Sequence, residues 1–126
     1  MTVEYLVKAD ESAEFLTDER CYITELGNSS HNASASLAIA RVEVGVTTQL
    51  HALMGTTETY IVIDGVGQME VDGHKFGISA GDQVVIPPGV AQRVTSEGEA
   101  DLRFYCLCTP RFQPSCYVNL EAESHL

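Results

Sequence analysis

Basic residues are scarce in this sequence. Seven Lys and Arg stand against 18 Asp and Glu, which gives a formal net charge of −11. Because contacts to nucleic-acid phosphates and to anionic membrane surfaces need clustered Lys and Arg, both classes of partner are disfavoured. The excess of acid by itself predicts solubility and no particular partner. A Gly-rich phosphate loop and a CxxC pair are also absent, so neither of these motifs suggests a chemistry.

Long apolar runs are absent as well. No stretch approaches the roughly 20 apolar residues that a membrane-spanning helix requires. Residues 1–6 lack the basic region and apolar run of a secretory signal. The four cysteines, Cys21, Cys106, Cys108 and Cys116, are therefore expected to be reduced thiols and not a disulfide framework. A cytoplasmic location is the default expectation.

What the sequence does contain is a series of short β-rich segments. From residue 20 onward, runs of β-branched and aromatic residues recur, and turn residues close each one. This pattern is typical of an all-β sandwich or barrel. The expected strands are residues 21–26, 37–44, 47–52, 58–63, 67–71, 75–78, 83–86, 92–95 and 102–109.

Two of the turns between these strands are specific. Asp72-Gly73 is a dipeptide favoured in a tight type I′ hairpin, where both residues need positive φ. Pro87-Pro88-Gly89 removes two successive backbone donors, so it predicts a loop between strands.

The domain organisation is expected to be simple. No linker, internal repeat or low-complexity tract divides the sequence, so residues 1–126 are predicted to form a single domain. Residues 110–126 contain two prolines and an acidic end, and they are expected to form a C-terminal strap and tail. Residues 9–16 could form a short helix.

Two predicted strands are apolar on both faces. In residues 58–63 and 102–108 the apolar side chains do not alternate with polar ones. A small barrel by itself buries only the inner face of each strand. We therefore expect the outer face to be covered, either by the N-terminal strands or by a second copy of the chain, and a homodimer is the favoured arrangement.

A first spaced motif begins at Gly45. His51 follows after five residues, Leu53 stands two residues further on, Glu58 comes after four more, and Gly65 after another six. Because side chains alternate along a strand, His51 and Leu53 share one face.

A second motif begins at Gly81. Pro87 follows after five residues, then Gly89, Gln92 after two more, and Ser96 after another three. Together the two motifs, 45–65 and 81–96, resemble those of the cupin superfamily (RmlC-like), and residues 92–94 and 108–112 resemble a subgroup of small bacterial cupins. The resemblance implies a double-stranded β-helix, the cupin or jelly-roll barrel.

The resemblance also implies a metal site, from which this sequence departs. Metal-binding cupins use two histidines and a glutamate of the first motif and a histidine of the second. Here Leu53 replaces the second histidine, Gln92 replaces the third, and Ser96 stands where asparagine is usual. The candidate ligands are therefore His51, Glu58 and Gln92, a nitrogen and oxygen set that suits one divalent transition metal such as Mn, Fe, Ni or Zn.

The alternative is a polar cluster that holds no metal, in which these three groups satisfy one another by hydrogen bonds. Under either interpretation they converge in a largely apolar barrel pocket, the default location of a ligand site. The other residues predicted to line this pocket are Gln49, Leu53, Tyr60, Val94, Phe104 and Cys106.

Other reactive side chains are better explained by packing or exposure. Cys106 and Cys108 face the same way, and core packing is favoured over a redox or metal pair. Tyr60 and Tyr105 are expected mainly in the core. Arg93 follows Gln92 directly, so it should point away from the pocket.

Two functions remain open, and no catalytic residue is assigned. The first is a metal-dependent enzyme acting on a small oxygenated metabolite, for which the resemblance implies dioxygenase, isomerase or lyase chemistry. The second is a non-enzymatic cupin that binds or senses a small molecule, such as a sugar-derived metabolite, with a degenerate metal site. A storage or structural role is a weaker third.

Overall fold

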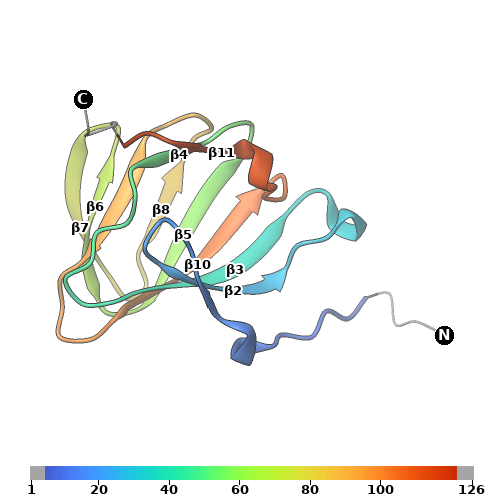
Figure 1. The fold of residues 1–126 in the computed structure, drawn as a ribbon, viewed down its shortest axis with the longest axis horizontal. Helices are drawn as coiled ribbons and strands as arrows, with labels where there is room; N and C mark the ends of the chain where they lie inside the picture. Colours follow the sequence, from blue (N-terminus) through green and yellow to red (C-terminus); the bar gives the residue numbers. More distant parts are fainter. Residues whose placement is uncertain (1–4, 122–126) are drawn as a thin grey trace.

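The computed structural model describes residues 5–121, whose strands form two antiparallel sheets (Figure 1). The six-stranded sheet has the order β1-β2-β3-β10-β5-β8, and the five-stranded sheet has the order β11-β4-β9-β6-β7. The strands are β1 (Phe15–Leu16), β2 (Tyr22–Gly27), β3 (Ser36–Val42), β4 (His51–Leu53), β5 (Thr57–Asp64), β6 (Val66–Val71), β7 (His74–Ser79), β8 (Gln83–Ile86), β9 (Gln92–Ser96), β10 (Leu102–Thr109) and β11 (Tyr117–Asn119). Short 3-10 helices are η1 (Glu11–Ala13), η2 (Ser30–Asn32) and η3 (Pro114–Cys116). The predicted all-β class is confirmed.

The apolar core lies between the two sheets. Strand β10 pairs with β3 on one side and with β5 on the other, and β5 alternates buried and partly exposed residues along most of its length. Tyr60, Val62 and Phe104 therefore point inward from the first sheet. Met69 and Val94 meet them from the second sheet, and both are fully buried. The two-residue period of each strand thus places one row of side chains in the interior.

The tight hairpin predicted at Asp72-Gly73 is confirmed. It joins β6 to β7, with Val71 paired to His74. Both turn residues have positive φ, 51° and 78°, as a type I′ turn requires. Gly65 is needed for a different reason, because a Cβ there would lie 2.7 Å from the carbonyl oxygen of Asp101.

Three local expectations need correction. Residues 9–16 form no α-helix: η1 is one short turn capped by Asp10, and Phe15 then pairs with Ile23 in β1. The strand expected at 47–52 is mostly loop, because only an isolated Thr47–Thr95 bridge precedes β4. The predicted strap contains strand β11, which pairs with β4. The end of the predicted tail, residues 122–126, lies outside the described residues, as do residues 1–4.

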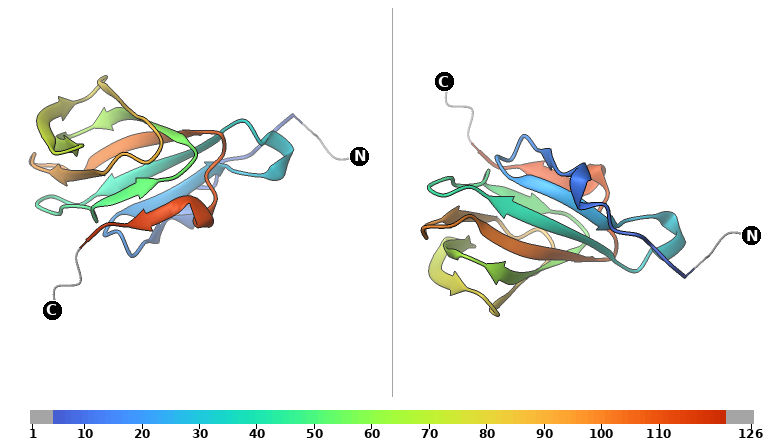
Figure 2. Two further views of the ribbon diagram at one scale, coloured as in Figure 1. Left: turned by 90° about the horizontal axis from the view of Figure 1, so that it is seen from above. Right: turned by 90° about the horizontal axis from the view of Figure 1, so that it is seen from below.

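The strap is close to the N-terminal part of the chain. In both views of Figure 2, β11 (red) and the N-terminal strands (blue) lie along the same edge of the molecule, while Figure 1 shows them on opposite sides of the barrel. An ion pair between Arg20 and Glu121 connects the two segments, and Glu121 also accepts a hydrogen bond from the backbone N–H of Leu50. Chain ends far apart in sequence therefore meet at one end of β4.

The outer face of the central strands is apolar and partly exposed. On β10, Tyr105 lies opposite Ile39 of β3 and Ile61 of β5, and Tyr105 and Ile61 keep intermediate exposure. Among residues 5–121, no helix is long and apolar enough to cross a membrane.

Candidate functional site

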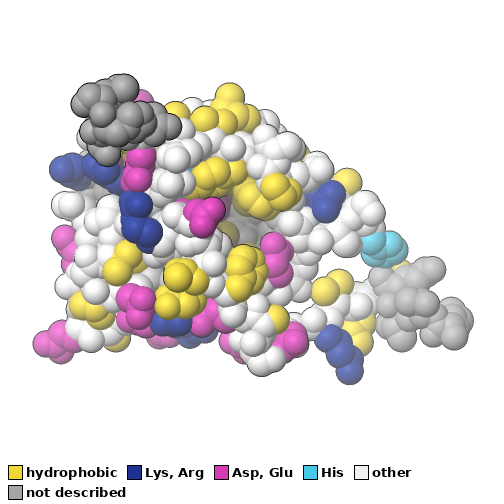
Figure 3. All heavy atoms as spheres, in the orientation of Figure 1, with side chains coloured by type: hydrophobic (Ala, Val, Ile, Leu, Met, Phe, Trp, Pro, Cys, Tyr) yellow, Lys and Arg dark blue, Asp and Glu magenta, His cyan; other side chains and the backbone are white. Residues whose placement is uncertain are grey.

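The barrel encloses a cavity of about 510 Å³. Figure 1 shows β4 and β11 on one side of the barrel and β2 and β3 on the other, and residues from all four segments contribute to the lining. Figure 3 shows the hollow on this face, with acidic and hydrophobic side chains at its edge. The cavity is large enough for a metabolite-sized ligand.

Most of the predicted pocket residues line this cavity. They are Gln49, His51, Leu53, Glu58, Tyr60, Phe104 and Cys106. Gln92 and Val94 are fully buried and do not belong to the lining. Val94 belongs to the apolar core, whereas Gln92 contacts two lining residues.

A continuous chain of hydrogen bonds connects Tyr60, Gln92 and Glu58. The Tyr60 hydroxyl donates to Gln92 Oε1 at 2.6 Å, and Gln92 Nε2 donates to Glu58 Oε1 at 2.8 Å. An ionised carboxylate can only accept, so the amide NH₂ must face Glu58 and the amide oxygen must face Tyr60. Tyr60 is held from its other side by Phe104, whose ring stacks on it at a centroid distance of 4.3 Å. The chain therefore fixes the position of the Glu58 carboxyl.

The environment of Glu58 raises the pKa of its carboxyl to about 7. Burial is the largest cause, because it disfavours the charged form. The charge of Glu19 adds to the rise, while hydrogen bonds from Gln92 and Cys106 oppose it. Burial likewise raises the pKa of Tyr60 well above its ordinary value, with the charge of Glu58 as the next cause. Glu58 therefore exchanges a proton near neutral pH, whereas the Tyr60 phenol keeps its own.

His51 faces the same cavity from β4. Its Nδ1 lies 2.7 Å from the backbone carbonyl oxygen of Gln49, and because a carbonyl only accepts, Nδ1 carries the proton. The ring stacks on Tyr117 at a centroid distance of 4.8 Å. Its Nε2 lies 3.7 Å from Glu19 Oε2. Ring orientation and tautomer are thus both determined.

Sequence reasoning missed much of the cavity lining, including three hydrogen-bonding residues, Glu19, Cys21 and Tyr117. The Cys21 thiol donates to Glu19 Oε1 at 2.8 Å, and the Tyr117 hydroxyl donates to Gln49 Oε1 at 2.6 Å. Burial raises the pKa of both the Cys21 thiol and the Tyr117 phenol, and the nearby Glu19 carboxylate raises both further. Nothing in the linear sequence distinguishes them, because each reaches the cavity through tertiary contacts.

The three predicted metal ligands do not fit a metal centre in this arrangement. Both polar atoms of the Gln92 amide are already engaged, with Tyr60 and with Glu58. His51 and Glu58 then provide only two donors. Within residues 5–121, no three His, Cys, Asp or Glu side chains are grouped so that they could hold an ion. Glu58 and Gln92 bond to each other as the alternative of a polar cluster expects, whereas His51 bonds to the backbone carbonyl of Gln49.

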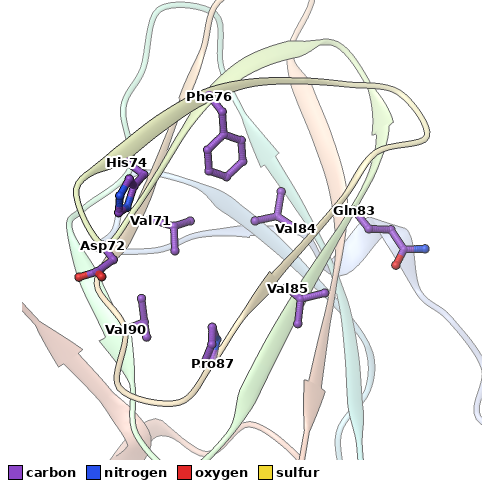
Figure 4. A pocket seen from close by; sticks show the side chains of 9 residues that line it. All are labelled: Val71, Asp72, His74, Phe76, Gln83, Val84, Val85, Pro87 and Val90. Atoms are coloured by element: carbon purple, nitrogen blue, oxygen red, sulfur yellow. The ribbon is translucent and has the colours of Figure 1, made fainter.

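A second hollow, of about 460 Å³, lies between the β6–β7 hairpin and β8. Figure 4 shows its mostly apolar side chains, among them Val71, Phe76 and Val84. The polar side chains there, Asp72, His74 and Gln83, belong to exposed residues. Without a buried polar group, this hollow lacks the fixed hydrogen-bonding partners of the barrel cavity, so the cavity is the stronger candidate site.

Two antiparallel sheets with a polar cluster between them place this chain among small β-barrel proteins that have an interior site. The chain belongs to the cupin domain family, whose model matches residues 38–108. It is 31% identical over 105 residues to the uncharacterised protein MJ1618 of Methanocaldococcus jannaschii, covering 82% of this chain and 84% of that one.

Solved structures of the same shape include two of Pac13. A variant of Streptomyces PAC13 with uridine matches with a TM-score of 0.78 and 20% identity, over 96% of each chain. Pac13, a nucleoside dehydratase, matches with a TM-score of 0.75 and 19% identity, over 94% of this chain and 96% of that one. At these identities the likeness shows the fold alone, the double-stranded β-helix of the cupins.

Proposed function

We propose that this cupin binds a small polar metabolite in its barrel cavity and transfers protons to and from it, as a lyase or isomerase does. The observation that carries the proposal is Glu58, a buried carboxyl with a pKa of about 7 that lines a cavity of about 510 Å³. A carboxyl of that pKa accepts and donates a proton equally well at neutral pH. Structural ion pairs also perturb pKa values, but no cation is paired with Glu58 among the described residues.

The neighbouring groups support the same chemistry. Gln92 holds Glu58 Oε1 in place, and His51 presents Nε2 while its Nδ1 is committed to Gln49. Either Glu58 or His51 would remove a proton from a carbon atom of the ligand, and the other would protonate a leaving hydroxyl. Water would then be released and a double bond formed. The proposal requires no metal, and the Mn, Fe, Ni or Zn ion that the family resemblance implied is not part of it.

The comparison with Pac13 supports this reaction class in one respect. A dehydratase acts through proton transfers, and that protein has the same fold. The comparison does not extend to the substrate, since fold alone does not determine it.

Ligand binding without turnover is the second candidate. It is favoured by the replacement of two histidine positions of the family motif by Leu53 and Gln92, and by a hydrogen-bond network that engages both polar atoms of the Gln92 amide inside the protein. Such a protein would carry or sense a metabolite.

A screen for turnover separates the two. The full chain is incubated with hydroxylated metabolites, including nucleosides and sugars, and products are detected by mass spectrometry. For a substrate that reacts, kcat/KM should change with an inflection near the pKa of Glu58. Glu58→Gln should abolish turnover, while Glu99→Gln, which makes the same charge change at an exposed position, should leave it unchanged. Turnover that survives Glu58→Gln, or a ligand that binds tightly without reacting, would contradict the acid–base proposal.

The remaining expectations also stay proposals. We propose a cytoplasmic setting, supported by four free cysteines, since thiols persist in reducing compartments. We propose a homodimer formed through the outer face of β3, β10 and β5, supported by the partly exposed apolar residues there. Nucleic acid and membranes are not proposed as partners, because the net charge is −11.

A further inference from the structure

The carboxyl groups that line the barrel cavity give it negative charge. Four carboxyl groups belong to its lining, those of Asp18, Glu19, Glu25 and Glu58. No lysine or arginine among the described residues lines it. The cavity therefore provides acceptors and negative charge, and apart from the imidazole of His51 no basic side chain that could hold a carboxylate or a phosphate.

The arginines near the cavity have other partners. Arg20 pairs with Glu121 in the strap, and Arg41 pairs with Glu14 and Asp101. Arg111 affects one lining carboxyl, that of Glu25, because its charge opposes the rise that burial causes in the pKa of Glu25. The Nε of Arg111 donates to Asn28 Oδ1 at 2.9 Å. This leaves the inner part of the cavity, around Glu19 and Glu58, without a lysine or arginine from residues 5–121, and the basic group there is the His51 imidazole, whose Nε2 lies 3.7 Å from Glu19 Oε2.

Glu19 extends a negative potential through that inner part. Its carboxylate contributes to the raised pKa of Glu58, of the Cys106 thiol and of the Tyr117 phenol, and burial is the largest cause at each of them. Three groups from β5, β10 and β11 thus experience the same charge. An anion entering the cavity would add to this repulsion, and a cation would relieve it.

The remaining walls are rich in aromatic rings. Phe15, Tyr60, Phe104, Phe112 and Tyr117 all line the cavity. The face of an aromatic ring attracts a cation, and the attraction is larger where water is excluded. Carboxylates and aromatic faces together therefore favour one kind of ligand, an ammonium group on an apolar body.

We propose that the ligand of the barrel cavity is a small organic cation, whose ammonium group lies between Glu19 and Glu58 and whose apolar body lies against the aromatic walls. The inference rests on the proposed function only in taking this cavity as the ligand site. It does not require that the ligand reacts.

Three probes of matched shape test the charge directly. Phenethylamine, phenethyl alcohol and hydrocinnamate share a phenyl ring on a two-carbon arm, and at about pH 8 they are a cation, a neutral molecule and an anion. Binding to the full-length chain is measured by isothermal titration calorimetry at that pH. The amine should bind at least about tenfold more tightly than the alcohol, and the carboxylate should give no binding heat.

Glu19→Gln assigns the preference to a residue. It should weaken amine binding by about tenfold and leave alcohol binding unchanged, since only the charged probe depends on the carboxylate. Glu99→Gln, which makes the same change in net charge at an exposed position, should leave both affinities unchanged. If Glu19→Gln does not fold, the ranking of the three probes on the unmodified chain still decides the question.

Several results would overturn the proposal. They are equal or tighter binding of the alcohol or the carboxylate, binding of none of the three probes, and a folded Glu19→Gln protein that keeps the full preference for the amine. The outcome is separable from that of the acid–base proposal. Amine selectivity without turnover on any compound supports the ligand class and contradicts the enzyme, whereas turnover of neutral metabolites with no amine preference does the reverse.

Discussion

At the scale of single residues, the chemistry of the cavity depends on how Glu58 is solvated and held. Its carboxyl is buried, is hydrogen-bonded by Gln92 and is exposed to the charge of Glu19, and the balance raises its pKa to about 7. The effect of burial on the pKa of Glu58 exceeds that of the hydrogen bonds, because no lysine or arginine of the described chain lines the site to stabilise the ionised form.

The raised pKa of Glu58 makes folding depend on pH. In the unfolded chain the carboxyl ionises near its ordinary pKa of 4.5, and in the folded protein it stays protonated up to about 7. Between these values the folded state binds more protons, so the free energy of unfolding should fall as the pH rises through this window. The contribution of Glu58 to this fall is about 3 kcal/mol.

Glu58→Gln should remove that contribution. The free energy of unfolding is measured by urea titration at about pH 5 and about pH 8, and the decrease between them should be smaller in the variant by about 3 kcal/mol. Glu99→Gln should keep the decrease of the unmodified protein. An unchanged decrease in Glu58→Gln would show that this carboxyl is not the group that titrates.

Tyr60→Phe tests the hydrogen bond that positions Gln92. The substitution keeps the ring that stacks on Phe104 but removes the hydroxyl that donates to Gln92 Oε1. A fully buried amide oxygen is then left without a donor, which should lower the free energy of unfolding by about 1–3 kcal/mol. Tyr105→Phe, on the partly exposed outer face, is the matched control and should change it by less than about 0.5 kcal/mol. Equal effects of the two would mean that the buried hydrogen bond contributes little.

At the scale of strands and turns, the locally encoded elements were predictable from the sequence. Asp72-Gly73 determines a hairpin because its backbone conformation is a property of two residues, and 83–86 was predicted with its observed bounds. The pocket residues on β4, β5 and β10 were found for the same reason, since alternation along a strand identifies the face they share.

Elements that exist only through tertiary contacts were not predictable. Strands β1 and β11 contain two and three residues, too few for a two-residue period to be visible. Tyr117 reaches His51 because β11 pairs with β4, and Glu19 reaches the cavity just ahead of β2. The bond between Gln92 and Glu58 was one of the two alternatives drawn from the sequence, but the bond from Tyr60 to Gln92 was not predicted, because Tyr60 comes from another strand. The sequence therefore predicted which residues converge and only part of how they bond.

The pairing of β4 with β9 predicts how a metal site could be restored. His51 lies directly opposite Gln92, and Leu53 shares the cavity with His51. Replacing Leu53 and Gln92 together by His would provide three imidazoles beside the Glu58 carboxylate, a donor set that suits Zn or Ni. The double variant should bind such an ion and melt at a higher temperature in its presence.

Two comparisons make the metal experiment decisive. The unmodified protein, purified without chelator, should show no change in melting temperature when the ion or a chelator is added. Adding His51→Ala to the double variant should abolish the gain. Metal-dependent melting of the unmodified protein would instead show that His51, Glu58 and Gln92 hold an ion as they stand, despite the hydrogen bonds of the amide.

At the scale of the whole molecule, the net charge and the outer face of the central strands both bear on association. The excess of 18 acidic over 7 basic residues disfavours non-specific association with polyanions. The outer face of β3, β10 and β5 carries apolar side chains instead, with Tyr105 between Ile39 and Ile61. A partly exposed apolar face on the central strands of a sheet is more readily explained by an interface than by solvent contact.

The proposed homodimer can be tested at Tyr105. Light scattering coupled to size-exclusion chromatography should give the unmodified protein twice the chain mass of 13.7 kDa. Tyr105→Glu places a charge in the middle of the proposed interface, where desolvation of the carboxylate opposes association, and should give the mass of one chain. Val66→Glu, on β6 of the other sheet and 48% exposed, adds the same charge away from that interface and should leave the dimer intact. A monomeric unmodified protein would contradict the dimer itself. A Tyr105→Glu protein that remains dimeric would show that the interface lies elsewhere. The apolar residues on the outer face of the central strands would then need a different explanation.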